Sequence, residues 1–451
     1  DDAVIDFEVT PNRPDWLGVD NIARDLAATG LGTLKTPEVT AVKGSFPCPV
    51  TIEIDAPDAC PVFAGRVVRG LKNGPSPEWL QTRLKAIGLR PISALVDITN
   101  LITYDRARPL HVYDISKLTG TLRARRGAGE TFAALDDKEY TCDETMCVIA
   151  DDARVLGLGG IVGGTYSGVT EDTTDILIEC AYFDPLTTRK TAKKLGVNSD
   201  AKYRFERGVD TGFVEGGLEM ATQMVLDLCG GEASDVSIAG EVPADPAVID
   251  FDPSLTNRLT GFDLSDDVMA KILTDLDFSV KQGKTWRVTV PSHRRDCTMG
   301  ADLVEEIARM HGLHNMVAQS LPTIGGRREA LATDLQNKTR RARRALAHQG
   351  LSEAVTWSFV SKEHATLFGG GADELDLDNP ISPELSSMRP SALIHLLLAG
   401  QKSADKGYPG AALFEAGPTY QSTGVDGQSP SIAGIRRIEM VRDWQGNSAP
   451  D

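Results

Sequence analysis

The segment around which this chain is organised covers residues 95–114 and reads LVDITNLITYDRARPLHVYD. Its first half is rich in β-branched residues, and Pro109 marks a polar turn before the end. This pattern predicts a buried strand that presents Thr99, Asn100 and His111 at its mouth, where they would hydrogen-bond a small polar ligand. The alternative is a core strand whose histidine is satisfied by the protein itself.

Composition limits the classes of protein to consider. A chain of 451 residues, 41% hydrophobic and 25% charged, is typical of a globular protein with about three domains. No apolar run approaches the roughly 20 residues of a membrane span, so we expect no membrane association. The seven cysteines show neither CxxC nor zinc-site spacing, which disfavours disulfide and structural-zinc frameworks and favours a reducing, cytoplasmic setting.

Charge is unevenly distributed along the chain. A net charge of −17 argues against a general nucleic-acid coat, because phosphate binding needs local positive potential. Four basic clusters are nevertheless candidates for contact with RNA, and the alternative for each is a solvated surface. The clusters are Arg123/Arg125/Arg126, Arg189/Lys190/Lys193/Lys194, Lys202/Arg204/Arg207 and Lys338/Arg340/Arg341/Arg343/Arg344.

The first forty residues predict a strand followed by a helix. Ile5, Phe7 and Val9 alternate as one face of a strand. After a proline-rich turn, Asp15 is expected to cap a helix that ends at Gly30. The residues expected to face the core from this helix are Val19, Ile22, Ala23 and Leu26.

A glycine-rich stretch, GLGGIVGG, occupies residues 157–164. It fits neither the dinucleotide fingerprint, because Val162 stands where the third glycine belongs, nor the P-loop, because no Gly-Lys-Ser/Thr follows. We therefore expect backbone packed close to a ligand or to another strand. An apolar strand follows at residues 175–180, and its one carboxylate, Glu179, needs a partner or a ligand.

A proline-containing break at residues 241–246 predicts a linker. Beyond it, a helix capped by Ser265 and a hairpin at residues 278–290 predict a compact winged-helix-like module. Four acidic residues end this module, and the last three share one face of a helix. They predict a hard-cation site, and the alternative is an acidic first turn that complements the helix dipole. The four acids are Asp296, Asp302, Glu305 and Glu306.

Several of these segments resemble the beta subunit of bacterial phenylalanyl-tRNA synthetase. The resemblance extends roughly from Ile5 to Tyr420 and is carried by TPNRPD, VDITN, RPLHVYD, NSDAKYRFERGVD and VPSHRRDCTMGADLVEEIARMHG. It implies an α+β multidomain chain in which the family's N-terminal tRNA-binding and C-terminal anticodon-contacting domains are absent. The implied parts are the end of an N-terminal domain (1–40), a mixed α/β editing domain (41–240), a winged-helix-like module with the acidic metal helix (245–322) and an incomplete, degenerate class II synthetase-like antiparallel sheet domain (330–451).

The resemblance also implies a function. The chain would be the scaffold and tRNA(Phe)-binding subunit of phenylalanine-tRNA ligase, with hydrolytic editing of mischarged tyrosyl-tRNA. Glu179 would accept the tyrosine hydroxyl, and Ala201 would leave room for the ring. An internal ion pair with a nearby arginine is the alternative for Glu179. The implied editing pocket comprises Thr99, Asn100, His111, Gly159, Gly160, Gly163, Glu179 and Ala201.

An assembly of two alpha and two beta subunits is implied as well, with ATP as substrate and Mg²⁺ shared between the four acids and the alpha subunit. The last domain lacks a convincing ATP site, since Arg389 is at most a remnant and Gly434 opens no Gly-x-Gly-x-x-x-Arg loop. The isolated chain is therefore not expected to aminoacylate. Two alternatives remain: a stand-alone editing hydrolase, which has no reason to keep the acidic helix, and a non-catalytic tRNA-binding or structural paralogue without editing.

Overall fold

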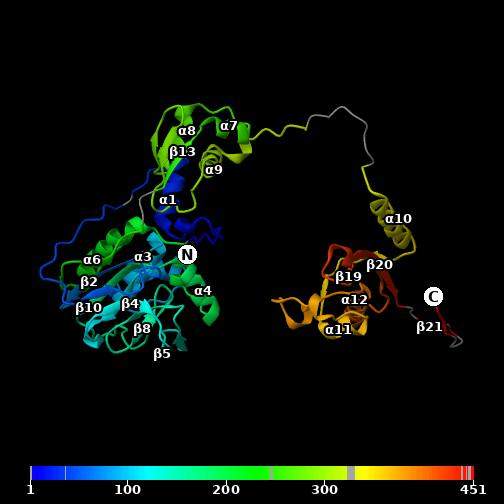
Figure 1. Cartoon of the computed structure of the whole chain (residues 1–451), viewed down its shortest axis with the longest axis horizontal. Coiled ribbons are helices and arrows are strands. Elements are labelled where there is room, and N and C mark those ends of the chain that lie inside the picture. The colour runs from blue at the N-terminus through cyan, green and yellow to red at the C-terminus, as the bar shows by residue number, and fades with distance from the viewer. Residues whose placement is uncertain are drawn as a thin grey trace. The chain divides into compact units, whose positions relative to one another are not determined.

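A computed structural model describes residues 3–35, 37–243, 247–321, 331–437, 440–442, 444 and 448–450. Contacts divide the chain into two compact units, Asp1–Gln319 and Ser320–Asp451 (Figure 1). The predicted linker at residues 241–246 lies within the first unit, and its last three residues fall outside the described ranges.

The first unit is built around an antiparallel sheet in which β10 (Ile176–Tyr182) lies between β2 (Val62–Arg69) and β3 (His111–Asp114). All seven residues of β10 are buried, as in a strand that is covered on both faces. Helix α6 (Val214–Cys229) packs against both β2 and β10. Two short strands, β11 (Glu232–Ala233) and β12 (Ser237–Gly240), pair with β2.

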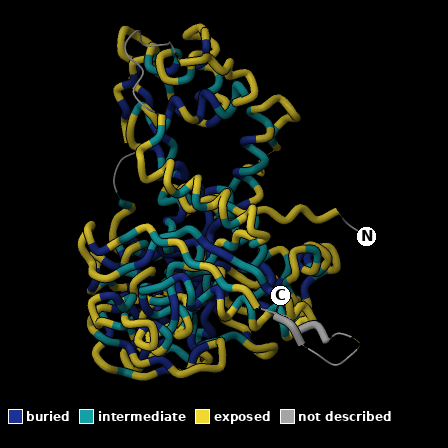
Figure 2. The backbone as a smooth tube through the Cα atoms, turned by 90° about the vertical axis from the view of Figure 1, so that its right-hand side faces the viewer, coloured by how far each residue is buried: buried dark blue, intermediate teal, exposed yellow. Residues whose placement is uncertain are grey.

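A second five-stranded sheet shares the core of the first. Ile52 and Leu122 from this sheet belong to the same hydrophobic cluster as Phe63 and Ile178 from the first one. Figure 2 shows the buried backbone gathered in the interior of this body. The strands, in their order across the sheet, are β1 (Ile52–Ile54), β4 (Leu122–Arg126), β7 (Cys147–Ala150), β8 (Val155–Leu158) and β9 (Val162–Gly163).

The predicted strand that opens the 95–114 segment is wrong, because these residues form helix α3 (Ala94–Arg106). Leu95, Ile98 and Ile102 are buried at spacings of three and four residues, which is the period of a helix rather than of a strand. Packing against α6 overrides the β-propensity of the branched residues. Only the end of the segment, in β3, is the strand that was expected.

The predicted strand through Ile5, Phe7 and Val9 is also wrong, since residues 3–10 contain no regular structure. The side chains of Ile5 and Phe7 are exposed, because no neighbouring strand in the described part of the chain pairs with this segment.

The expected helix near the N-terminus is α1 (Val19–Ala28), which follows a 3-10 turn at Pro14–Leu17. Its buried residues are Asn21 and Asp25, whereas the predicted core residues Val19 and Leu26 are exposed. The helix turns this polar face inward because Asp25 pairs there with arginine side chains.

One of these partners, Arg309, belongs to a compact module in the same unit, which consists of a three-stranded antiparallel sheet and three helices. Trp286 is fully buried in it, with its ring 5.9 Å from that of Phe251. Helix α9 contacts α7 and α8 and closes the module. The elements are β13 (Val248–Phe251), α7 (Ser254–Thr260), α8 (Asp266–Asp275), β14 (Ser279–Lys281), β15 (Trp286–Thr289) and α9 (Gly300–His311).

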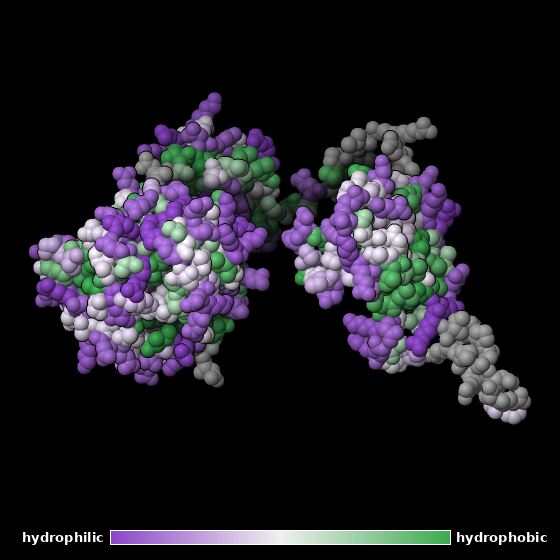
Figure 3. Space-filling model, turned by 60° about the horizontal axis from the view of Figure 1, so that its bottom comes forward, coloured by the Kyte–Doolittle hydropathy of each residue, from purple (hydrophilic) through white to green (hydrophobic). Residues whose placement is uncertain are grey.

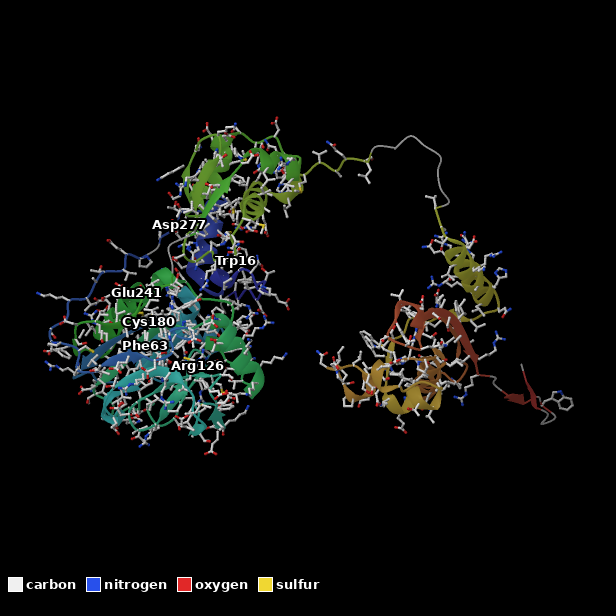
Figure 4. All side chains as sticks on the ribbon, in the orientation of Figure 1. Trp16, Phe63, Arg126, Cys180, Glu241 and Asp277 are labelled. Carbon is white, nitrogen blue, oxygen red and sulfur yellow. The ribbon has the colours of Figure 1, made fainter. Side chains whose placement is uncertain are left out.

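A buried ionic network joins α1 to this module. Asp25 accepts hydrogen bonds from Arg13 at 3.1 Å and from the indole of Trp16 at 3.0 Å, and it pairs with Arg309 at 2.8 Å. Figure 4 shows Trp16 between the module and the body that holds the sheets.

Glu306 is the second acidic centre of the network. It pairs with Arg294 at 2.6 Å and with Arg309 at 2.5 Å, and only 3% of its side chain is exposed. Burial alone would raise the pKa of Glu306, but the hydrogen bond and charge of Arg294 outweigh burial and hold that pKa at about 2. The paired charges therefore fix how α9 sits against the N-terminal segment.

The second unit is centred on the hairpin of β19 (Ala412–Tyr420) and β20 (Gln428–Arg436), with β16 (Ser352–Glu353) parallel to β19. The basic helix α10 (Asp334–His348) has no buried residue. Helix α12 (Leu393–Asp405) packs on the hairpin.

This second unit leaves large apolar side chains exposed, and Figure 3 shows a continuous hydrophobic patch on it. A groove of about 1070 Å³ runs between α10, β19 and β20. Exposed apolar surface of this kind marks a site of association. The exposed apolar side chains of this unit include Val355, Trp357, Leu367, Ile381, Tyr408 and Val425.

The remaining elements are short or peripheral. No helix within the described ranges is long and apolar enough to cross a membrane. All seven cysteines are free. The other helices and strands are α2 (Glu78–Ala86), β5 (Glu130–Ala133), β6 (Glu139–Cys142), α4 (Pro185–Leu195), α5 (Asp200–Phe205), β17 (Phe359–Val360), α11 (Lys362–Leu367), β18 (Ser387–Met388), β21 (Met440–Arg442) and β22 (Ser448–Pro450), with 3-10 turns at Ile115–Lys117, Thr211–Phe213, Leu313–Asn315, Asp373–Leu375, Pro383–Leu385 and Val425–Gly427.

Replacing Arg294 with Met should lower the free energy of unfolding of the first unit by about 3–5 kcal/mol, because it removes one of the two close arginine partners of the buried Glu306. Urea unfolding followed by circular dichroism measures this loss. The control is Lys271→Met, which breaks an exposed pair with Asp275 and should cost at most about 1 kcal/mol. Equal losses in the two variants would mean that the network does not stabilise the unit.

Candidate functional site

A small hollow of about 90 Å³ lies in the first unit between β3, β10, the glycine-rich segment and α5. It is smaller than the roughly 300 Å³ at which pockets for whole small molecules begin, so it accommodates one side-chain-sized group. The residues that line this hollow include His111, Tyr113, Gly159, Gly160, Gly163, Glu179, Phe183, Ala201 and Phe205.

The pairing of β3 with β10 sets the polar groups of the hollow. Their register places Glu179 directly opposite His111. Tyr113 lies two residues further along β3, so it shares the face of His111 and reaches Glu179 diagonally. Its hydroxyl donates a hydrogen bond to Oε2 of Glu179 at 2.5 Å, and its ring lies edge-on to the imidazole of His111 with centroids 4.5 Å apart.

Burial controls the protonation of these groups. Burial raises the pKa of the Glu179 carboxyl to about 7, and the hydrogen bond from Tyr113 acts in the opposite direction. Burial lowers the pKa of the His111 imidazole to about 4, so this ring is neutral near neutral pH. Nε2 of His111 is buried without a hydrogen-bond partner in the described structure, which leaves it available to a ligand.

The alternative for Glu179, an ion pair with an arginine, is absent from the described residues, where its polar partner is the neutral Tyr113. A buried carboxylate with one neutral donor keeps acceptor capacity for a second donor, because each carboxylate oxygen carries two lone pairs.

The glycine-rich segment packs closely against rings of the protein. A Cβ on Gly163 would lie 2.5 Å from Cε1 of His111, and a Cβ on Gly159 would lie 2.6 Å from the ring of Phe183. Gly160 adopts a positive φ of 69° and also faces Phe183. These glycines therefore allow the backbone to approach the aromatic wall of the hollow.

Ala201 lines the hollow from the first turn of α5, and Phe205 follows one turn later. The ring of Phe205 lies edge-on to that of Phe183 at 5.2 Å. A small residue at position 201 keeps this side of the hollow open.

Six of the eight predicted pocket residues thus come together, whereas Thr99 and Asn100 do not line the hollow. Both lie on α3, and the hydroxyl of Thr99 donates to the carbonyl of Val96 at 2.8 Å. Sequence reasoning missed Tyr113 and Phe183. The alternation of His111 and Tyr113 along one strand face was the available signal for Tyr113.

Three of the four acidic residues of the module are engaged by protein partners. Arg294 binds Asp296 at 2.8 Å and Glu306 at 2.6 Å. Asp302 accepts two backbone N–H groups at the start of α9, at 2.7 and 2.9 Å, in a capping arrangement. Glu305 is exposed.

These residues do not fit a magnesium site as they stand. Three of the four carboxylates already serve an arginine or the helix N-terminus, and Mg²⁺ needs free oxygens in octahedral geometry. Among the residues that the structure describes, no group of three or more His, Cys, Asp or Glu side chains is arranged to hold a metal. Helix capping accounts for Asp302, and magnesium binding remains a prediction.

Arg389 in the second unit is fully buried. Its guanidinium donates to Glu415 at 2.8 Å, to the hydroxyl of Thr356 at 2.9 Å and to the carbonyl of Pro418 at 2.9 Å. Its guanidinium donates these hydrogen bonds to the protein itself, so it does not offer a pair of N–H donors to a phosphate.

Three family models match successive parts of the chain. The B3/4 domain matches residues 59–230, the tRNA synthetase B5 domain matches residues 249–313, and the phenylalanyl tRNA synthetase beta chain CLM domain matches residues 318–443. The first match contains the hollow, and the second contains α9. This succession defines a subunit of an aminoacyl-tRNA synthetase.

Whole-chain comparisons make the assignment specific. The phenylalanine–tRNA ligase beta subunit from Mesorhizobium japonicum is 50% identical to this chain over 100% of the chain's length. The beta subunits from Rhodopseudomonas palustris and Brucella suis are each 49% identical to this chain, over 99% and 100% of its length respectively. The chain belongs to the phenylalanine–tRNA ligase beta-subunit family. It spans 57%, 56% and 57% of the length of these relatives.

A solved N-terminal fragment of the phenylalanyl-tRNA synthetase beta-subunit from Pyrococcus horikoshii is 17% identical, with a TM-score of 0.34 over 67% of this chain and 84% of that one. A TM-score this low does not establish a common fold for the two chains.

Replacing Tyr113 with Phe should raise the pKa of Glu179 further, because the hydrogen bond that favours the carboxylate is lost. A carboxyl whose pKa is higher in the folded than in the unfolded protein lowers the free energy of unfolding as the pH rises from the unfolded-state pKa to the folded-state pKa. The loss of unfolding free energy between pH 5 and pH 8 should therefore grow by about 1–2 kcal/mol in the variant.

Urea unfolding at the two pH values measures this difference. The matched control is the same substitution in a Glu179→Gln background, where the added pH dependence should vanish because no carboxyl remains to titrate. A Tyr113→Phe variant with the parent's pH dependence would contradict the assigned coupling.

Proposed function

We propose that this chain contributes to phenylalanine–tRNA ligase as its beta subunit and that the hollow around Glu179 hydrolyses tyrosine mis-attached to tRNA(Phe). The observation that carries the editing proposal is the buried Glu179 carboxylate, which faces the hollow opposite neutral His111 and has no cationic partner among the described residues. A structural carboxylate in such a place would be expected to hold a cation or several donors.

Tyrosine and phenylalanine differ by one hydroxyl group. A pocket that hydrogen-bonds this hydroxyl rejects the analogue without it strongly, because the buried polar group is then left unpaired. Glu179 retains an oxygen for the tyrosine hydroxyl, and the size of the hollow suits the tip of one aromatic side chain. This chemistry supports discrimination in favour of the mischarged substrate.

Hydrolysis in this site would use water rather than a protein nucleophile. The nearby thiols of Cys60, Cys147 and Cys180 are buried, and burial raises the pKa of each, so they remain protonated. Unpartnered Nε2 of His111 can orient a water or the ester. The tRNA's own hydroxyl would assist the attack.

The first test is deacylation of tyrosyl- and phenylalanyl-tRNA(Phe) by the enzyme assembled with an alpha subunit. Glu179→Ala should abolish the preference for the tyrosyl ester, a loss of about 100-fold or more for a hydroxyl-reading site. Ala201→Trp should block the hollow, while aminoacylation of tRNA with phenylalanine stays at the parent's rate. Unchanged tyrosine clearance in both variants would favour the alternative of a tRNA-binding paralogue without editing.

Activation of phenylalanine is proposed to belong to the alpha subunit, in an assembly of two alpha and two beta subunits that uses ATP and magnesium. The internal use of Arg389 supports this division, because adenylate formation needs donors aimed at the phosphates. The exposed apolar surface of the second unit supports a scaffolding role beside a partner subunit.

The isolated chain should therefore give no phenylalanine-dependent ATP–pyrophosphate exchange above background. The same assay on the chain mixed with an alpha subunit is the positive control. Robust exchange by the isolated chain would overturn the scaffold assignment, whatever the outcome of the deacylation assay.

A further inference from the structure

A second hollow of about 640 Å³ lies on the other side of α5 from the Glu179 pocket. Helix α4 supplies Arg189 and Lys193 to its wall, and α5 with the turn after it supplies Lys202, Glu206 and Arg207. Figure 1 shows α4 on the outside of the body that contains the sheets. We call this hollow the basic cleft.

The basic cleft holds more positive charge than the protein itself neutralises. Lys202 and Arg207 share the carboxylate of Glu206 at 3.0 and 3.1 Å. Arg189 and Lys193 are exposed, one helical turn apart, and form no ion pair within the described part of the chain. Four cations therefore face one carboxylate.

The whole chain has a net charge of −17, and several other basic residues of the first unit have acidic partners. Arg126 pairs with Asp58, Arg125 with Glu130 at 2.7 Å, and Lys194, next to Lys193 on α4, with Asp143 at 2.5 Å. An uncompensated cluster in an acidic protein points to an anionic ligand.

The position of the basic cleft connects it to the pocket. Ala201 and Phe205 of α5 line the Glu179 hollow, while the adjacent residues Lys202 and Glu206 line the basic cleft. The two hollows are thus separated by the thickness of one helix, about 10–12 Å with side chains. A flexible chain of phosphates can pass the cleft while its terminal ester enters the hollow.

We propose that the basic cleft binds the backbone phosphates of the single-stranded end of an RNA whose terminal ester is read in the Glu179 hollow. The proposal rests on the proposed editing function and adds the path by which the substrate reaches it. Arg189 and Lys193 bind phosphates directly, because neither forms an ion pair within the described part of the chain. Lys202 and Arg207 bind phosphate in competition with their ion pairs to Glu206.

The test measures KM and kcat for deacylation of tyrosyl-tRNA(Phe) by the assembled enzyme over a range of salt concentrations. Arg189→Gln and Lys193→Gln should each raise KM about 3- to 10-fold and reduce the slope of log KM against log salt by about 0.7, because each removes one phosphate contact to a single strand. The value of kcat should stay within about twofold, since neither residue touches the ester.

Lys190→Gln is the matched control. Lys190 is an exposed cation on the same helix that does not line the basic cleft, so its loss should leave KM and the salt slope within experimental error. Equal effects at positions 189 and 190 would reduce the cleft to diffuse surface charge, and no effect at positions 189 and 193 would overturn the proposal.

A binding measurement separates this proposal from the editing function. Hairpin RNAs that copy the acceptor end, with and without their single-stranded nucleotides, are titrated into the assembled enzyme, and inorganic phosphate at matched ionic strength is the competitor. Arg189→Gln should remove only the affinity gained from the single-stranded nucleotides. If the parent fails to deacylate tyrosyl-tRNA yet binds more tightly to the hairpins with single-stranded nucleotides, the result contradicts the editing function and supports RNA binding in the basic cleft. If the single strand adds no affinity and phosphate alone competes, the cleft is a small-anion site and the proposal fails.

Discussion

Strand β10 is the constraint on which the first unit depends. It pairs along its whole length with β2 and over four residues with β3, and all seven of its residues are buried. A strand enclosed in this way has one register, because a shift by one residue would turn every side chain to the opposite face. Glu179 therefore cannot escape to water, and its position opposite His111 is set by backbone pairing rather than by side-chain choice.

Two buried glutamates show how partners decide the behaviour of a carboxyl group. Glu306 has two arginines, and its pKa falls to about 2, so its stabilising effect is present above the unfolded pKa and is lost only as pH falls through the folded value. Glu179 has a tyrosine, and its pKa rises to about 7, so stability decreases as pH rises from the unfolded value to neutrality. The first arrangement holds segments together, whereas the second leaves a carboxyl oxygen free to accept a hydrogen bond in the hollow proposed to act in editing.

Sequence reasoning succeeded where the pattern is local and failed where distant contacts decide. The helix that ends before Gly30 and the helix that carries Asp302, Glu305 and Glu306 follow from local spacing. Residues 95–106 were misread because branched residues fit a strand, while contacts with α6 select a helix. Placing Thr99 and Asn100 in the pocket depended on that strand. The sequence did not predict the arginines that pair with Asp296 and Glu306, because spacing shows which acidic residues share a helix face but not which cations lie near them in the fold.

The pKa of Glu179 also bears on how the hollow would distinguish tyrosine from phenylalanine in the proposed editing reaction. As a carboxylate it accepts a charge-assisted hydrogen bond from a phenol, which is roughly twice as strong as a neutral one. As a neutral carboxyl it still both donates and accepts, so a phenol remains better satisfied than a bare ring. Because Tyr113 already fills one oxygen, a bare ring leaves the other without a donor in a space of about 90 Å³ that excludes most water. In the proposed editing reaction, selection would come from the acceptor that a phenylalanine ring leaves unpaired, and it would persist in both protonation states of Glu179.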